Sequence, residues 1–201
     1  MLEQLDGYSD LEFRDVLAFS GGAVCGSYRS ADPFVGGGRF TPFVVWGDYI
    51  RARPTQADVA FFCSDESEEI LRNDHGIGPI ADQHANLLHI RRDLRLLESA
   101  VEKYRAQNFR LPSANEGLAA LLNPADSVPQ DANEFVGEYL EALPIDPWGR
   151  PYGFVPIGLG GGVTQQFDLY TLGANNTAGG VGEDADIRLI HLPYLDYVLP
   201  N

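Results

Sequence analysis

An apolar stripe between Gln83 and Gln107 constrains the fold more than any other feature of the chain. Its residues recur at alternating steps of three and four: Leu87, Ile90, Leu94, Leu97, Val101 and Tyr104. Steps of this size bring side chains to one face of an α-helix, which has about 3.6 residues per turn. The sequence therefore predicts one long helix over about residues 82–107, with this face packed on a C-terminal sheet.

The residues before this helix follow a different pattern, in which short aromatic and β-branched runs alternate with glycines. Runs of this kind are typical of short strands joined by tight turns. We expect strands at residues 16–19, 23–28, 39–46 and 49–52, and a short helix at 58–62. An acidic stretch and a Gly- and Pro-containing segment then lead to the long helix. The predicted organisation is a small β-rich domain (1–67), a linker (68–82) and a second domain (83–201).

Two local signals follow the long helix. Ser113 and Glu116 have the spacing of a capping box, which predicts a short helix that runs to Leu122. The segment Asp146-Pro147-Trp148-Gly149 has proline and glycine where a type I turn favours them. Strands at 152–155 and 167–171, joined by the glycine-rich residues 158–162, then complete an antiparallel hairpin. The expected fold class is therefore α+β, with a long helix packed on a small antiparallel sheet.

Composition narrows the functional classes. The chain has 201 residues, is 44% hydrophobic and carries a formal net charge of −15. This much apolar material favours a packed core over disorder, and the negative charge disfavours nucleic acid and anionic membranes as partners. No apolar run reaches the length of about 18 residues that spans a membrane. The N-terminus lacks a basic region followed by an apolar one, so we expect a cytosolic protein or one whose leader was removed.

A polar, glycine-rich segment, "GANNTAGGVGEDADI", lies after the last predicted strand. It offers amide and carboxylate oxygens, which are the ligands that Ca²⁺ prefers. Asn, Asp and Gly are also common in solvated turns, and the spacing is not that of an EF-hand. The residues alone therefore leave a calcium site and a plain turn both open.

Three segments carry a resemblance to a known family. "VEKYRAQNFRLPSANEGLAALLNP", "YLEALPIDPWGRPYGFVP" and "FDLYTLGANNTAGGVGEDADI", in this order, resemble the C-terminal body of the major pseudopilin of type II secretion, the G subunit. The resemblance covers about residues 83–188. It implies a long helix on a small antiparallel sheet, a calcium ion in the loop after the sheet's strand, and no catalysis. It also implies assembly with other pseudopilins into a periplasmic filament.

Together with the oxygens of the loop, the resemblance implies a set of calcium ligands: the Leu172 carbonyl, Asn175, Glu183, Asp184 and Asp186. The chain departs from the family pattern at two places in this loop. Asn175-Asn176 stands where the family has Asp-Gly, and Val181 stands where it has Glu. The polar residues 74–86 also lie where the family has an apolar helix.

Residues 11–63 are similar, more weakly, to a small bacterial extracytoplasmic domain of obscure role. That resemblance implies that Cys25 and Cys63 pair in a disulfide, and a small exported domain often needs such a cross-link. The alternative is two free thiols in a cytosolic protein. A thiol nucleophile with a histidine base is a further possibility that no local motif supports.

Three hypotheses of function follow. The first is a non-enzymatic, calcium-stabilised pseudopilin-like protein in or beside a type II secretion filament. The second is a soluble extracytoplasmic module that reuses the pseudopilin scaffold to bind a protein partner. The third is an enzyme, which would need a cleft with convergent titratable groups. The first two place the protein in the periplasm or another extracytoplasmic space.

Overall fold

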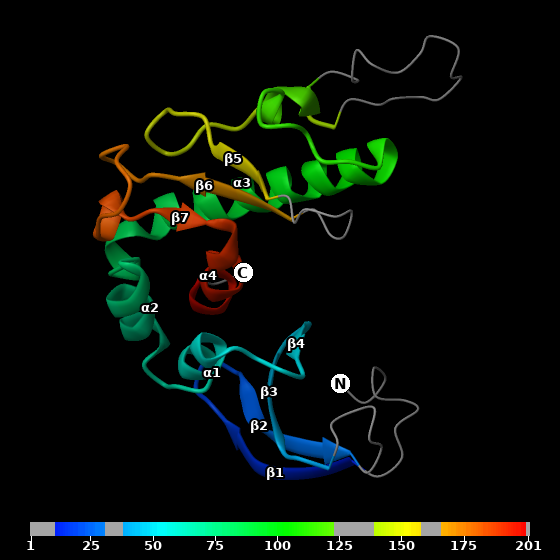
Figure 1. The fold of residues 1–201 in the computed structure, drawn as a ribbon. Helices are drawn as coiled ribbons and strands as arrows, with labels where there is room; N and C mark the ends of the chain where they lie inside the picture. Colours follow the sequence, from blue (N-terminus) through cyan, green and yellow to red (C-terminus); the bar gives the residue numbers. More distant parts are fainter. Residues whose placement is uncertain (1–10, 31–37, 123–138, 158–165, 200–201) are drawn as a thin grey trace. The chain divides into compact units, whose positions relative to one another are not determined.

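A computed structural model describes residues 11–30, 38–122, 139–157 and 166–199 of the chain (Figure 1). The chain divides into two compact units, Met1–Asp74 and His75–Asn201. These are called the N-terminal and C-terminal units below.

The N-terminal unit contains a four-stranded antiparallel sheet in the order β1-β2-β3-β4. Its strands are β1 (Leu11–Ala18), β2 (Val24–Ser30), β3 (Thr41–Trp46) and β4 (Tyr49–Arg51). All four predicted strands are therefore present, although β1 begins five residues earlier than expected. Pairing with β2 extends it, because Leu11 lies opposite Ser30 at the far end of the ladder.

Two helices follow the sheet: α1 (Gln56–Phe62) and α2 (Ser67–His75). Helix α2 lies in the first half of the segment 68–82 that the sequence predicts as a linker. Its first turn carries Glu68 and Glu69, which interact favourably with the helix dipole. Leu71 is fully buried, so this helix has an apolar side.

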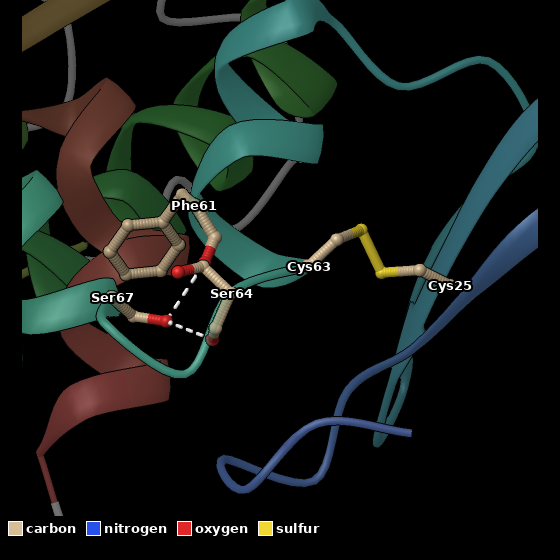
Figure 2. Close-up of a disulfide and its surroundings, with 5 residues drawn as sticks. All are labelled: Cys25, Phe61, Cys63, Ser64 and Ser67. Atoms are coloured by element: carbon tan, nitrogen blue, oxygen red, sulfur yellow. Dashed lines mark hydrogen bonds between the residues drawn. A yellow bond between two sulfur atoms is a disulfide. The ribbon is translucent and has the colours of Figure 1, made fainter. Parts of the chain in front are cut away.

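A disulfide between Cys25 and Cys63 ties the end of α1 to strand β2, with 5.9 Å between the two Cα atoms (Figure 2). Next to it, the Ser67 hydroxyl donates to the Phe61 carbonyl (2.8 Å) and the Ser64 carbonyl (3.0 Å). These bonds satisfy carbonyls at the end of α1 and begin α2. The cross-link and the hydroxyl together hold the turn between the two helices.

The C-terminal unit is built on helix α3 (Ile80–Asn108), which begins two residues before the predicted start. Its predicted apolar face is confirmed, because all six residues of the stripe are completely buried. The helix contacts strand β6 and helix α4. Among the helices of the described residues, none combines the length and the apolar character needed to cross a membrane.

The sheet of this unit has three antiparallel strands in the order β5-β6-β7: β5 (Gly153–Ile157), β6 (Gln166–Thr171) and β7 (Ile187–Arg188). The predicted hairpin is β5-β6, and its connection at 158–162 lies outside the described residues. Strand β7 and the C-terminal elements were not predicted. The latter are the short 3₁₀ turn η4 (Leu189–His191) and helix α4 (Leu192–Val198).

The short helix predicted after Ser113 is present as a 3₁₀ turn, η2 (Gly117–Leu121). The two reciprocal bonds of the box are present between Ser113 and Glu116. However, the Glu116 carboxylate also binds both terminal nitrogens of Arg110, at 2.7 and 2.8 Å. The box therefore stabilises the turn into η2, and the pKa of Glu116 falls to about 2 because of the Arg110 and Ser113 bonds.

A buried carboxylate links α3 to the start of β5. Asp93 accepts hydrogen bonds from Arg92 (3.0 Å) and from the Tyr152 hydroxyl (3.3 Å), and His89 Nε2 lies 3.0 Å from its Oδ2. Burial and the nearby Asp93 charge raise the pKa of Tyr152. Because a buried carboxylate is costly unless its oxygens have donors, this set makes the position of β5 on the helix specific.

Replacing one buried leucine of the stripe should weaken the C-terminal unit. Leu97 is 0% exposed, whereas its neighbour Leu96 is 46% exposed on the other side of the helix. Leu97→Ala should lower the free energy of unfolding by about 2–5 kcal/mol, because it leaves a cavity. Leu96→Ala should cost less than about 0.5 kcal/mol. Urea unfolding of both variants measures the difference, and equal costs would contradict the buried face.

Candidate functional site

The glycine-rich loop runs from Gly173 to Asp186 and joins β6 to β7. Its two ends lie on neighbouring strands, where Thr171 pairs with Ile187. The loop also closes on itself, since the Ala174 N–H donates to the Glu183 carbonyl at 2.7 Å. A 3₁₀ turn, η3 (Gly182–Asp184), forms its second half. The segment is therefore a folded loop with internal backbone bonds.

Two glycines allow the halves of the loop to touch. Gly173 has a φ of +66°, and a Cβ there would lie 2.6 Å from the Glu183 oxygen. Gly180 has a φ of +116°, and its Cβ would lie 2.4 Å from the Asp184 oxygen. Any side chain would thus be strained and would collide with backbone atoms. These positions require glycine, which accounts for the glycine-rich sequence without any ligand.

The predicted type I turn holds the loop in place. The Gly149 N–H donates to the Asp146 carbonyl (2.9 Å), the hydrogen bond that closes a β-turn. The Asp146 carboxylate is 3% exposed and accepts from the Arg150 N–H (2.8 Å) and the Thr171 hydroxyl (2.7 Å). It thereby joins the turn to the end of β6.

Arg150 extends this support into the loop. Its guanidinium donates to the carbonyls of Gly173 and of Ala174, the latter at 3.1 Å. Asp146 and Arg150 are therefore positioning residues for the loop. Sequence reasoning identified their turn but missed this role, which depends on contacts 23–25 residues away along the chain.

Asp186 has the environment that best suits a cation. Its Oδ2 accepts from the Gly179 N–H at 3.1 Å, while its Oδ1 is buried and has no hydrogen-bond partner. A buried carboxylate oxygen without a donor costs roughly 1–3 kcal/mol or more. A bound cation would compensate that cost, so Asp186 fits the role that the sequence predicted for it.

The other predicted ligands have different surroundings. Asn175 and Glu183 are exposed, and Leu172 and Asp184 are half-buried. The Asn175 side-chain oxygen accepts from the Thr177 N–H at 2.8 Å, as in an Asx-turn. Among the described residues, no three Asp, Glu, His or Cys side chains gather as a metal-binding group.

The 3₁₀ turn gives a physical reason for this separation. Successive residues on such a turn are rotated by about 120°, so Glu183 and Asp184 occupy different sides of η3. A calcium ion here would therefore draw on Asp186, backbone carbonyls and at most part of the predicted carboxylate set. Oxygen donors of this mixed kind are suitable for Ca²⁺.

The turn, the loop and nearly all of the long helix lie in the part of the chain that matches a known family. The family model of the type II secretion system (T2SS), protein G, matches residues 81–190. The chain belongs to this family. The match confirms the resemblance drawn from the three segments, and it includes α3, the three-stranded sheet and the glycine-rich loop. Residues 1–80, with the four-stranded sheet and its disulfide, lie outside it.

The type II secretion system core protein G of Pseudomonas aeruginosa is 41% identical over 95 residues, which are 47% of this chain and 64% of the relative. That of Vibrio cholerae is 38% identical over 96 residues, 47% of this chain and 62% of the relative. The chain thus spans less than two thirds of their length. The crystal structure of the major pseudopilin of enterohaemorrhagic Escherichia coli is 29% identical, with a TM-score of 0.42, and covers 54% of this chain and 90% of that one.

Two glycine substitutions separate backbone strain from collision in the loop. Gly173 and Gly179 both have a positive φ, but a Cβ on Gly179 has no atom within 4 Å. Gly179→Ala should therefore cost about 1–2 kcal/mol, the strain of a left-handed residue. Gly173→Ala should cost about 1–3 kcal/mol more because of overpacking. Denaturant unfolding measures both values, and equal costs would contradict the close approach at Gly173.

Proposed function

We propose that this protein is a non-enzymatic, pseudopilin-like component of type II protein secretion, or a protein that acts beside that system. The observation that carries the proposal is the family match over residues 81–190, the part of the chain that contains α3 and its sheet. The relatives are named as core proteins of this system, and one as its major pseudopilin. The proposed partners are other pseudopilins, and the proposed location is the periplasm or another extracytoplasmic space.

The C-terminal unit has features that suit a structural subunit. Its buried face, the Asp93 set and the Asp146–Arg150 support make a rigid body around one helix. Each charged group in these sets has partners within the unit. Their role in this proposal is to hold shape, which a repeated subunit needs.

We further propose that the glycine-rich loop binds one calcium ion. The support is the buried Asp186 Oδ1, together with amide and carbonyl oxygens in a loop that glycines fold back on itself. When bound, the ion would neutralise Asp186 and link the loop's two ends. Candidate ligands besides Asp186 are Asp184, Glu183, Asn175 and the Leu172 carbonyl. Exported proteins meet roughly millimolar calcium, at which even a weak extracellular-type site is largely filled.

The N-terminal unit favours a second candidate function. It lies outside the family match and has its own sheet, which the Cys25–Cys63 disulfide links to the end of α1. Disulfides persist in oxidising compartments, in keeping with an extracytoplasmic location. In this second proposal the unit binds an extracytoplasmic protein, and the pseudopilin-like unit serves as its scaffold.

Loss of the gene in the organism that encodes it tests the secretion role. We expect type II substrates to disappear from the medium and to accumulate in the periplasm, and the full-length chain supplied on a plasmid to restore release. Accumulation in the periplasm separates a secretion block from poor expression. Normal release in the deletion strain would contradict the secretion role and favour the separate binding module.

Calcium should raise the melting temperature of the full chain in chelator-treated buffer. Binding to the native state alone adds about 2.7 kcal/mol when calcium is at a hundred times its Kd. Asp186→Asn keeps the shape of the side chain but removes its charge, so most of this increase should be lost, as it should in Asp184→Ala. Without calcium, both variants should melt close to the wild type. Magnesium should substitute poorly, since it requires a tighter octahedral site.

A matched control is Glu141→Gln, which removes one carboxylate from an exposed position of the same unit. This variant should keep the full calcium response. If calcium leaves the wild-type melting temperature unchanged and isothermal titration detects no binding, the calcium proposal is wrong.

A further inference from the structure

Two histidines meet at the beginning of the C-terminal unit. His75 ends α2, and His191 ends η4, near the other end of the chain. Their ring centroids are 4.9 Å apart in an edge-to-face arrangement, and the His75 ring also lies 5.4 Å from Tyr194 of α4. The contact therefore joins the first residue of the unit to its C-terminal segment.

His191 is held in its neutral form. It is 7% exposed, and its Nδ1 accepts a hydrogen bond from the Arg188 N–H at 3.1 Å. A second proton on the ring would have to occupy Nδ1, which would break that bond. Burial, the neighbouring His75 and the Arg188 charge lower the pKa of His191 to about 4.

The groups that face this ring do not compensate a positive charge. His75 of α2 and Arg188 of β7 lower the pKa of His191, whereas Asp168 of β6 raises it. However, the Asp168 carboxylate already accepts from the Arg188 Nε (2.7 Å) and, at 3.4 Å, from the Leu189 N–H. Tyr194 of α4 presents its ring to His75 and carries no charge. A second proton on His191 is therefore poorly stabilised as long as the contact is closed.

The residue after His75 makes a second attachment. The Gly76 carbonyl accepts from the Gly182 N–H at 2.8 Å, and a Cβ on Gly76 would lie 2.8 Å from the Gly180 oxygen. Residues 75 and 76 are thus bound on one side to histidine and tyrosine rings and on the other to the glycine-rich loop. They precede α3 and belong to the chain segment that joins the two units.

We propose that His75 and His191 form an acid-sensitive latch: protonation of His191 detaches residues 75–76 from the glycine-rich loop and from the C-terminal segment. An open latch exposes His191 to water, where a histidine has its ordinary pKa of about 6.5. The closed form, with its lowered pKa, is fully favoured above that ordinary value. The free-energy difference that favours the closed form over the open form decreases as the pH falls from about 6.5 towards about 4. The latch does not depend on calcium or on the secretion role.

Hydrogen exchange of the full chain in chelator, at pH 7 and pH 5 and corrected for intrinsic rates, tests the latch. Linkage predicts that opening at residues 75–78 and 187–192 increases on the order of tenfold at pH 5. Exchange in the buried part of α3, residues 87–101, should not change with it. His191→Asn retains an acceptor but cannot take the proton, and should abolish the increase. His84→Asn, a change of another half-buried histidine, should leave it intact.

Three outcomes would overturn the latch. These are unchanged protection of residues 75–78 in the wild type, a full pH response in His191→Asn, or equal loss of protection in α3, which would indicate global unfolding. NMR titration of the wild-type His191 ring provides a measurement that needs no variant. A pKa near 6.5 for that ring in the folded chain would also refute the proposal.

Discussion

Burial of one face of α3 is the constraint on which the C-terminal unit depends. Each leucine of that face gains about 1.5–3 kcal/mol by leaving water, so the stripe is the largest single source of stability on this helix. Polar contacts then determine where other elements lie on it. Asp93 receives the Tyr152 hydroxyl at the start of β5, and Arg95 binds Asp196 of α4 at 2.6 Å. The apolar face provides the energy, and these pairs make the arrangement specific.

Contacts within the C-terminal unit hold the glycine-rich loop in shape without a ligand. Asp146 fixes the turn that carries Arg150, and Arg150 holds the first carbonyls of the loop. Glycines allow backbone to touch backbone at the other side. This preorganisation leaves one carboxylate oxygen of Asp186 buried without a donor. In the calcium proposal, a cation bound at this oxygen would compensate for the missing donor.

Three elements show details that the sequence pattern did not predict. Helix α2 lies inside the predicted linker 68–82, and its acidic residues favour its first turn. The short helix predicted after Ser113 is the 3₁₀ turn η2, and Arg110 binds the Glu116 of its capping box. Strand β7 has only two residues, which are too few to show an alternating sequence pattern. It forms by pairing with β6. For η2 and β7, contacts with residues outside the element decided between local alternatives.

The sequence by itself determined the long helix, the strands other than β7, the turn at Asp146–Gly149 and the family, because periodicity and turn chemistry act over a few neighbouring residues. It also indicated which loop carries the oxygen donors. Only the tertiary structure decided that Asp186 has an unpaired buried oxygen, that Arg150 supports the loop, and that His75 meets His191. These contacts join residues far apart in the chain, and their geometry depends on how whole elements pack, which no local pattern encodes.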